Sequence, residues 1–276
     1  MSDQTSNGTP LSNKEVTNRD LAGRILRGLW RGARRRQLEL RYHLGREVWA
    51  NTKRFATGDE VRNVEIIDLP ALRDEMATAY IDDPNRAVLS VLCKAVGAKT
   101  FFEIGTNRGR TTLSVARTNP EIEIVTLDLP SPEAGDQTEL DLTEADKRLF
   151  TDWRRGEAFE GEPEAERITQ VLGDSATFDY SPYEGKMDVV FIDGSHSYPY
   201  VTNDTRVAER LLSPNGMIVW DDYPGFPGVI QCVLESARRL DGPVIHILGT
   251  RLAVWSRKPL EIDERGAEER RGVTVA

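Results

Sequence analysis

The chain has 276 residues, 39 % of them hydrophobic and 29 % charged, and its formal net charge is −9. This composition supports one sizeable core and excludes a chain that is disordered throughout. No apolar run approaches the roughly 18 residues of a membrane span, the polar start lacks the apolar core of a secretion signal, and the acidity disfavours broad nucleic-acid binding. Two cysteines are too few for a disulfide framework. We therefore expect a cytoplasmic protein.

The two ends and a basic stretch differ from the rest of the chain. Residues 1–20 predict a disordered leader and residues 257–276 a flexible tail. Residues 22–54 hold ten Lys or Arg against two Glu, with apolar residues at helical spacing, so we assign residues 21–84 to a basic helical extension. Its role stays open between packing on the main domain or within a homo-oligomer, peripheral contact with an anionic inner membrane surface, and binding of a polyanion such as RNA. No aromatic-rich RNA motif accompanies the arginines, so nucleic acid is the least favoured partner.

Residues 85–256 alternate strand and helix patterns around an acidic insert at 129–166. This alternation predicts a mostly parallel sheet with helices on both faces. The last two strands are joined by only two residues, so they must pair antiparallel. The expected strands are 99–104, 122–127, 168–172, 187–192, 217–220, 243–248 and 251–256, and the expected helices are 110–117, 198–212 and 229–240.

A glycine turn, in the segment FFEIGTNRGRTT, follows the first of these strands. Gly105 and Gly109 let the backbone approach a ligand closely, and the helix that follows offers free N–H groups. The dinucleotide fingerprint and the P-loop are both absent, so the turn suits a nucleoside-type ligand without an obligatory pyrophosphate. Asp128 ends the next strand, where a carboxylate can accept bonds from ribose hydroxyls. Asp174 and Ser175 follow the third strand, where they can reach an adenine edge.

Five segments in order resemble the class I S-adenosylmethionine-dependent methyltransferases: EIGTNRGRTT, TLDLP, GDSATFDY, FIDGSHSYPYVTND and SPNGMIVWDDY. The resemblance covers about residues 85–256. It implies a Rossmann-like, seven-stranded, mostly parallel sheet with an antiparallel last strand, in agreement with the inferred hairpin, and S-adenosyl-L-methionine as cofactor. The cofactor-binding residues that it implies are Glu103, Gly105, Thr106, Gly109, Asp128, Asp174, Ser175 and Asp193.

Three carboxylates follow the fourth and fifth strands, Asp193 in FIDGSH and Asp221 with Asp222 in VWDDY. Neighbouring parallel strands would bring them to one rim, where they repel one another unless protons or a cation neutralise them. Such ligands suit Mg²⁺ or another hard divalent cation. The placement is similar to that of the metal-dependent O-methyltransferases of the catechol and macrolide-sugar types and of cephalosporin hydroxylase-like proteins, which implies all three as ligands. The alternative is that Asp221 and Asp222 only cap the next turn.

His196 lies three residues after Asp193, in the same loop. A neutral imidazole there can act as a general base, so we take His196 and Asp193 as candidate catalytic residues. The alternative for His196 is a structural hydrogen bond. Tyr198 is expected to form a wall of the pocket.

The sequence thus predicts a methyltransferase that transfers a methyl group to a hydroxyl of a small molecule or glycan, assisted by a divalent cation. Two other classes stay open: a nicotinamide-dependent Rossmann oxidoreductase, although GxGxxG is missing, and a non-catalytic adaptor with the methyltransferase fold. The acidic insert is either a solvated excursion or a lid. If it is a lid, Phe150, Trp153 and Phe159 would close over the ligand.

Overall fold

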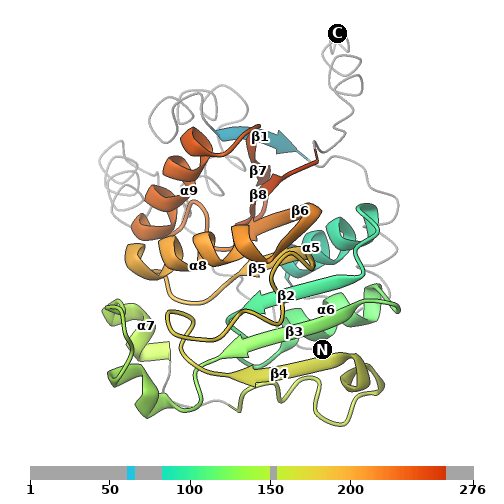
Figure 1. Ribbon diagram of the computed structural model, residues 1–276, viewed down its shortest axis with the longest axis vertical. Helices are drawn as coiled ribbons and strands as arrows, with labels where there is room; N and C mark the ends of the chain where they lie inside the picture. The colour runs from blue at the N-terminus through green and yellow to red at the C-terminus, as the bar shows by residue number, and fades with distance from the viewer. Residues whose placement is uncertain (1–60, 66–82, 150–153, 259–276) are drawn as a thin grey trace, which may run out of the picture. The chain divides into compact units, whose positions relative to one another are not determined.

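The structure, a computed structural model, describes residues 61–65, 83–149 and 154–258. The basic helices expected in 22–54, the leader and most of the tail lie outside these residues. An eight-stranded sheet forms the centre of the described part (Figure 1). Its strands are β1 (Val61–Glu65), β2 (Thr100–Ile104), β3 (Glu123–Asp128), β4 (Ile168–Leu172), β5 (Met187–Ile192), β6 (Leu212–Trp220), β7 (Val244–Leu248) and β8 (Ala253–Ser256). The helices are α5 (Pro84–Ala95), α6 (Arg110–Thr118), η1 (Pro132–Asp136), α7 (Glu144–Leu149), η2 (Pro163–Arg167), α8 (Tyr198–Leu211) and α9 (Pro227–Arg239).

The strands follow the order β1-β7-β8-β6-β5-β2-β3-β4. Strand β8 runs antiparallel to both of its neighbours, and every other pair is parallel. The seven strands from β2 to β8 therefore confirm the predicted fold, including its closing antiparallel hairpin.

Strand β1 is an addition that the sequence analysis did not predict. It falls within residues 21–84, the stretch expected to be helical, and pairs along β7 with Val61 opposite Val244. The segment VRNVE lacks the apolar–polar alternation of a half-buried strand, so its five residues give little signal beside the basic helical pattern before it.

Two helical layers cover the sheet (Figure 1). Helices α5 and α6 contact each other on one face, and α8 and α9 contact each other on the opposite face. Because side chains alternate along a strand, neighbouring residues join different cores. Phe101 and Val189 pack in the core with α5 and α6, whereas Phe102 and Val190 pack in the core with α8 and α9.

Backbone hydrogen bonds keep the chain aligned just beyond the ends of the central strands. The Asp193 N–H donates to the Ile104 carbonyl at 2.8 Å, and the Asp221 N–H donates to the Ile192 carbonyl at 3.0 Å. The loops after β2, β5 and β6 therefore start side by side at one edge of the sheet, and in Figure 1 helix α7 of the insert lies at the same end. Within the described ranges, no helix has the length and apolar character that crossing a membrane requires.

Candidate active site

A cavity of about 470 Å³ lies at the carboxyl ends of the central strands. This volume falls within the range of small-molecule and cofactor sites. Residues from every predicted motif line it, whereas Glu103, Tyr198 and Phe159, which were also expected at the site, are not in the lining. The predicted site residues in the lining are Gly105, Thr106, Gly109, Asp128, Asp174, Ser175, Asp193, His196, Asp221 and Asp222.

The turn after β2 requires glycine at its first position. Gly105 has φ +104°, and a Cβ there would lie 2.2 Å from the Asp193 carbonyl oxygen. Gly109 has φ +77° and is the N-cap residue of α6, and a Cβ there would meet the ring of Phe159 at 2.5 Å. Phe159 is thus buried behind the turn, and it is not among the cavity lining. The insert does reach the site, but the prediction that Phe159 closes over the ligand is wrong, and Phe150 and Trp153 lie outside the described residues.

Glu103 lies beneath the turn. Its side chain is completely buried, and its Oε2 atom accepts hydrogen bonds from the Thr112 and Thr126 hydroxyls. Burial raises the pKa of Glu103 to about 7, against the lowering effect of these two bonds. The Thr126 hydroxyl is also 2.6 Å from that of Thr106, which does line the cavity. Glu103 therefore supports the turn from below, whereas the resemblance implied a direct cofactor contact.

Asp128 is fixed by backbone amides at the end of β3. Its Oδ2 atom accepts from the Asn107 N–H and its Oδ1 atom from the Leu129 N–H, both at 2.7 Å. Burial raises the pKa of Asp128, while these amides and the Arg155 guanidinium, 3.8 Å away, act in the opposite direction. A carboxylate has about four acceptor positions. Asp128 therefore keeps capacity for the two hydroxyls of a ribose.

Asp174 is held in the same manner on the far side of β3. Its carboxylate accepts from the N–H groups of Ala176 and Glu139 and from the Tyr200 hydroxyl, each at 2.8 Å. Tyr200 lines the cavity, although the sequence analysis expected Tyr198 to do so. Residues two positions apart on a helix face different sides, and the Tyr198 hydroxyl instead donates to Glu235 on α9.

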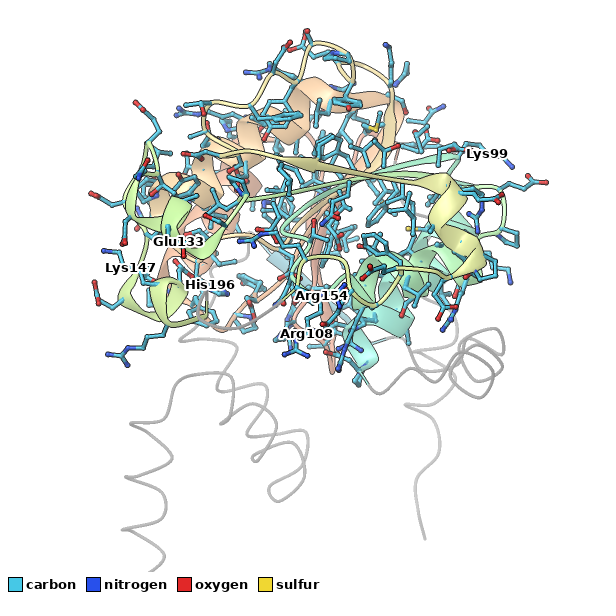
Figure 2. All side chains as sticks on the ribbon, turned by 90° about the horizontal axis from the view of Figure 1, so that it is seen from below. Lys99, Arg108, Glu133, Lys147, Arg154 and His196 are labelled. Carbon is cyan, nitrogen blue, oxygen red and sulfur yellow. The ribbon has the colours of Figure 1, made fainter. Side chains whose placement is uncertain are left out.

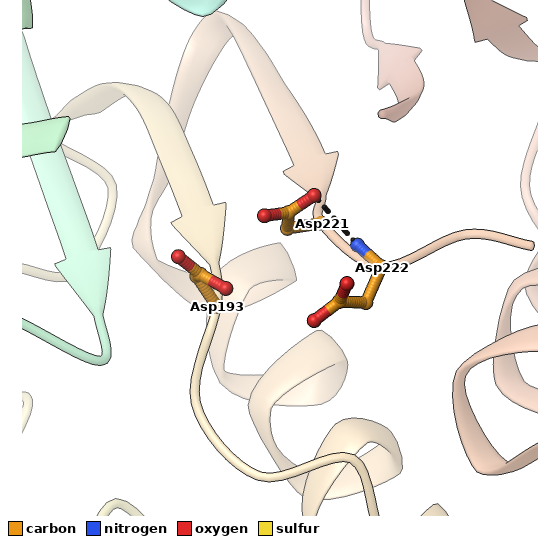
Figure 3. Close-up of side chains that lie close together, drawn as sticks. All are labelled: Asp193, Asp221 and Asp222. Carbon is orange, nitrogen blue, oxygen red and sulfur yellow. Dashed lines mark hydrogen bonds between the residues drawn. The ribbon is translucent and has the colours of Figure 1, made fainter. Parts of the chain in front are cut away.

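The three predicted metal ligands come together (Figure 3), and we call Asp193, Asp221 and Asp222 the acid cluster. Each offers one carboxylate oxygen, and these atoms lie within 4.8 Å of one another. Asp222 has φ +59°, a left-handed conformation that directs this non-glycine residue toward the others. Burial, followed by the charges of Asp221 and Asp222, holds the pKa of Asp193 well above its usual range. Within the described residues, the Asp193 carboxylate has no hydrogen-bond partner.

Arg251 pairs with the acid cluster from the loop between β7 and β8. Its Nη2 atom donates to Asp221 Oδ2 at 2.9 Å and its Nε atom to Asp221 Oδ1 at 3.2 Å. The same Nε atom lies 3.0 Å from Asp222 Oδ1. Asn85 adds a 3.2 Å bond to Asp221 Oδ1. The sequence analysis gave no role to Arg251 or Asn85.

His196 lies between two carboxylates. Its Nε2 atom is 2.7 Å from Asp222 Oδ2, and its Nδ1 atom bonds to Asp146 of helix α7. Burial favours the neutral imidazole, but the bonds to Asp146 and Asp222 outweigh this effect and raise the pKa of His196 to about 9. Its ring stacks on Phe226 with centroids 3.8 Å apart. Figure 2 shows His196 on the side of the molecule where Glu133 and Lys147 of the insert lie.

Asp146 is the anchor between the insert and the site, and the sequence analysis missed it. Its side chain is 3 % exposed and accepts from the Ser195 hydroxyl at 2.8 Å and from the Thr143 N–H at 3.0 Å, in addition to His196. Although burial alone would raise it, the pKa of Asp146 is lowered to about 2, mainly by the bonds from His196 and Thr143. One residue of the acidic insert therefore orients the imidazole.

Residues 102–223 match the family model described as a methyltransferase domain. The matched part carries the glycine turn, the Asp128 and Asp174 positions, His196 and the acid cluster. This segment is therefore similar to methyltransferase domains, and together with the strand order the match confirms the resemblance to the class I S-adenosylmethionine-dependent methyltransferases. The match gives no support to the alternative of a nicotinamide-dependent oxidoreductase.

Solved structures with a similar chain trace include three methyltransferases. An O-methyltransferase of tomaymycin synthesis, TomG from Streptomyces achromogenes, solved with S-adenosylmethionine, is 19 % identical, with 68 % of this chain and 88 % of that chain covered and a TM-score of 0.44. The S-adenosylhomocysteine-bound methyltransferase PaMTH1 from Podospora anserina is 18 % identical, with 92 % of this chain and 100 % of that chain covered and a TM-score of 0.45. A methyltransferase from Geobacter sulfurreducens is 14 % identical, with 68 % of this chain and 89 % of that chain covered and a TM-score of 0.44. No curated protein matches this chain.

Proposed function

We propose that the protein is an S-adenosylmethionine-dependent O-methyltransferase whose acceptor is a hydroxyl of a small molecule or glycan. The observation that carries the proposal is the fixed pair of carboxylates at the cavity, Asp128 at the end of β3 and Asp174 just after the neighbouring strand β4. Their backbone bonds hold both acceptors in place before a ligand arrives, which suits the ribose and the adenine of the cofactor. The glycine turn at Gly105 and Gly109 would receive the methionine end.

The methyl group would be transferred in line from the sulfonium to the acceptor oxygen. The oxygen forms a bond to the methyl carbon, the carbon–sulfur bond breaks, and the products are a methyl ether and S-adenosylhomocysteine. The acceptor hydroxyl loses its proton in this step, and the Nε2 atom of His196 is the candidate to take it. Asp146 on Nδ1 would hold the ring in the orientation that this transfer needs.

The donor set of the acid cluster fits a hard divalent cation. The cluster offers three carboxylates, and one of them, Asp193, is a half-buried cavity residue with no hydrogen-bond partner in the described part of the chain. A divalent cation at this place would neutralise the cluster and stabilise the negative charge that develops on the acceptor oxygen. Asp222 would then turn from His196 to the cation, leaving the Nε2 atom able to accept a proton.

Calorimetric titration with S-adenosylhomocysteine tests the cofactor site. Asp128→Asn should weaken binding by about tenfold or more, because the amide cannot accept both ribose hydroxyls. Asp179→Asn, an exposed aspartate outside the cavity, is the matched control and should bind within about twofold of the wild type. A wild-type protein that fails to bind, or an Asp128→Asn variant that binds as tightly, contradicts the proposed cofactor site.

A transfer assay with methyl-labelled cofactor and a panel of hydroxyl, amine and thiol acceptors, run with and without Mg²⁺, tests the chemistry. Transfer of the label to a hydroxyl acceptor, in a methyl ether product that resists hydrolysis by base, supports O-methylation. Transfer only to amine or thiol acceptors would retain the methyltransferase and refute the oxygen acceptor.

A further inference from the structure

Arg251 covers the oxygen atoms that the acid cluster would offer to a cation. Its guanidinium makes a forked contact to both Asp221 oxygens, at 2.9 and 3.2 Å. The same group pairs with Asp222 Oδ1 at 3.0 Å, and the other Asp222 oxygen bonds to His196. All four carboxylate oxygens of Asp221 and Asp222 therefore already have a cationic partner from the protein.

Asp193 differs from its two neighbours. Both of its carboxylate oxygens lack a hydrogen-bond partner within the described residues, and burial together with the charges of Asp221 and Asp222 keeps its pKa high. A cation held by all three residues would have to take oxygens that Arg251 now occupies. A guanidinium and a divalent cation repel each other strongly at such short range, so the two cannot share these oxygens.

We propose that Arg251 competes with the divalent cation for Asp221 and Asp222, and so sets the metal affinity of the site. This inference rests on the proposed metal-assisted function. Without a cation, the guanidinium balances the two carboxylates and holds them in position. When a cation binds, the guanidinium leaves, and the free energy of its contacts is subtracted from the free energy of metal binding.

The structure gives the Arg251 side chain room and a destination. The side chain is 28 % exposed, and Asp83 Oδ2 lies only 3.9 Å from its Nη2 atom. The backbone is anchored separately, since the Arg251 N–H donates to Asn85 Oδ1 and the Arg251 carbonyl accepts from the Tyr223 N–H, both at 2.9 Å. The guanidinium can therefore turn toward Asp83 while the loop between β7 and β8 stays in place.

Titration of Mn²⁺ into the full chain, followed by electron paramagnetic resonance of the free ion, tests the inference without any acceptor substrate. Arg251→Met should bind Mn²⁺ about ten- to a hundredfold more tightly than the wild type, because the competing charge-assisted bonds are gone. Arg108→Met is the matched control. Arg108 lines the same cavity but pairs with Glu157 at 2.8 Å, so its loss should leave the Mn²⁺ affinity within about threefold.

A second variant covers the case in which Arg251→Met fails to fold. Arg251→Lys keeps the charge but loses the forked geometry, and it should give a smaller gain in Mn²⁺ affinity. Equal Mn²⁺ affinity in the wild type and in the folded Arg251 variants overturns the competition while leaving the metal site standing. Absence of Mn²⁺ binding in every variant overturns both the competition and the metal-assisted part of the proposed function. Binding of S-adenosylhomocysteine, measured on the same samples, reports separately on the cofactor site.

Discussion

Replacing Glu103 with glutamine separates two roles for this residue, contact with the cofactor and support of the turn from below. The structure buries the carboxyl group completely and places it outside the cavity lining. Glutamine has nearly the same shape and can still accept hydrogen bonds from Thr112 and Thr126, but it does not ionise. The variant therefore removes one titration and little else.

The size of the effect follows from the pKa of Glu103, which burial raises from 4.5 to about 7. Between these two values the folded state holds a proton that the unfolded chain has released, so wild-type stability falls as the pH rises through this window. At 1.36 kcal/mol per pKa unit, the total loss is about 3 kcal/mol. Glu103→Gln is free of this loss, so the wild type should lose about 3 kcal/mol relative to the variant between pH 4.5 and pH 8.

Urea denaturation of both proteins at pH 4.5, 6 and 8 measures this difference, because the titrations they share cancel in the comparison. Binding of S-adenosylhomocysteine should stay within about threefold of the wild type, since Glu103 lies outside the cavity lining. A stability difference that does not change with pH would refute the buried, protonated state. A loss of cofactor affinity of about tenfold or more would instead support the direct cofactor contact that the resemblance implied.

Two further substitutions test the loops around the cavity. Asp146→Asn should lower kcat by about ten- to a hundredfold while the KM for the cofactor stays nearly unchanged, because the imidazole of His196 loses its orienting carboxylate. Steady-state kinetics measures both constants, with the exposed Asp141→Asn variant as the control. An unchanged kcat in Asp146→Asn contradicts the orienting role. Gly105→Ala should cost more than about 3 kcal/mol or prevent folding, because its Cβ would meet a carbonyl at 2.2 Å. Gly185→Ala is the control: Gly185 has φ +71°, but a Cβ there would meet nothing within 4 Å, so the change should lower stability by only about 1 kcal/mol. Thermal melting of both variants measures the difference.

The sequence was sufficient to predict the sheet and to place the site at the carboxyl ends of its strands. Apolar runs, glycines and the two-residue hairpin joint are local signals, and parallel strands bring their ends to one edge wherever they lie in the chain. The positions of Asp128, Asp174, Asp193 and Asp222 follow from this rule alone. Glu103 differs from the expectation because a carboxylate at the end of a strand was expected to point outward, whereas the structure buries this one completely.

The partners of these carboxylates could not be predicted, because they come from distant parts of the chain. Asp146 is 50 residues from His196, and Arg251 is 30 residues from Asp221. Arg251 lies on a loop and Asp146 on the six-residue helix α7, and neither segment is long enough to show a periodicity that fixes the direction of a side chain. Tyr200 was missed for a different reason: it lies about 200° around α8 from Tyr198, and the sequence pattern does not show which of the two tyrosines faces the cavity.

The two ends of the cavity are held by different kinds of donor, and this difference bears on how each responds to ligands. At the proposed cofactor end, Asp128 and Asp174 accept mainly from backbone N–H groups, which cannot leave without unfolding the turns that carry them. At the acceptor end, Asp222 is held by the side chains of Arg251 and His196, which can change partner by rotation alone. A fixed cofactor end costs little reorganisation when the ligand binds, whereas an adjustable acceptor end can exchange protein cations for a metal ion. Under the proposed function, charge compensation at the acid cluster would therefore couple metal binding to the freeing of the candidate base.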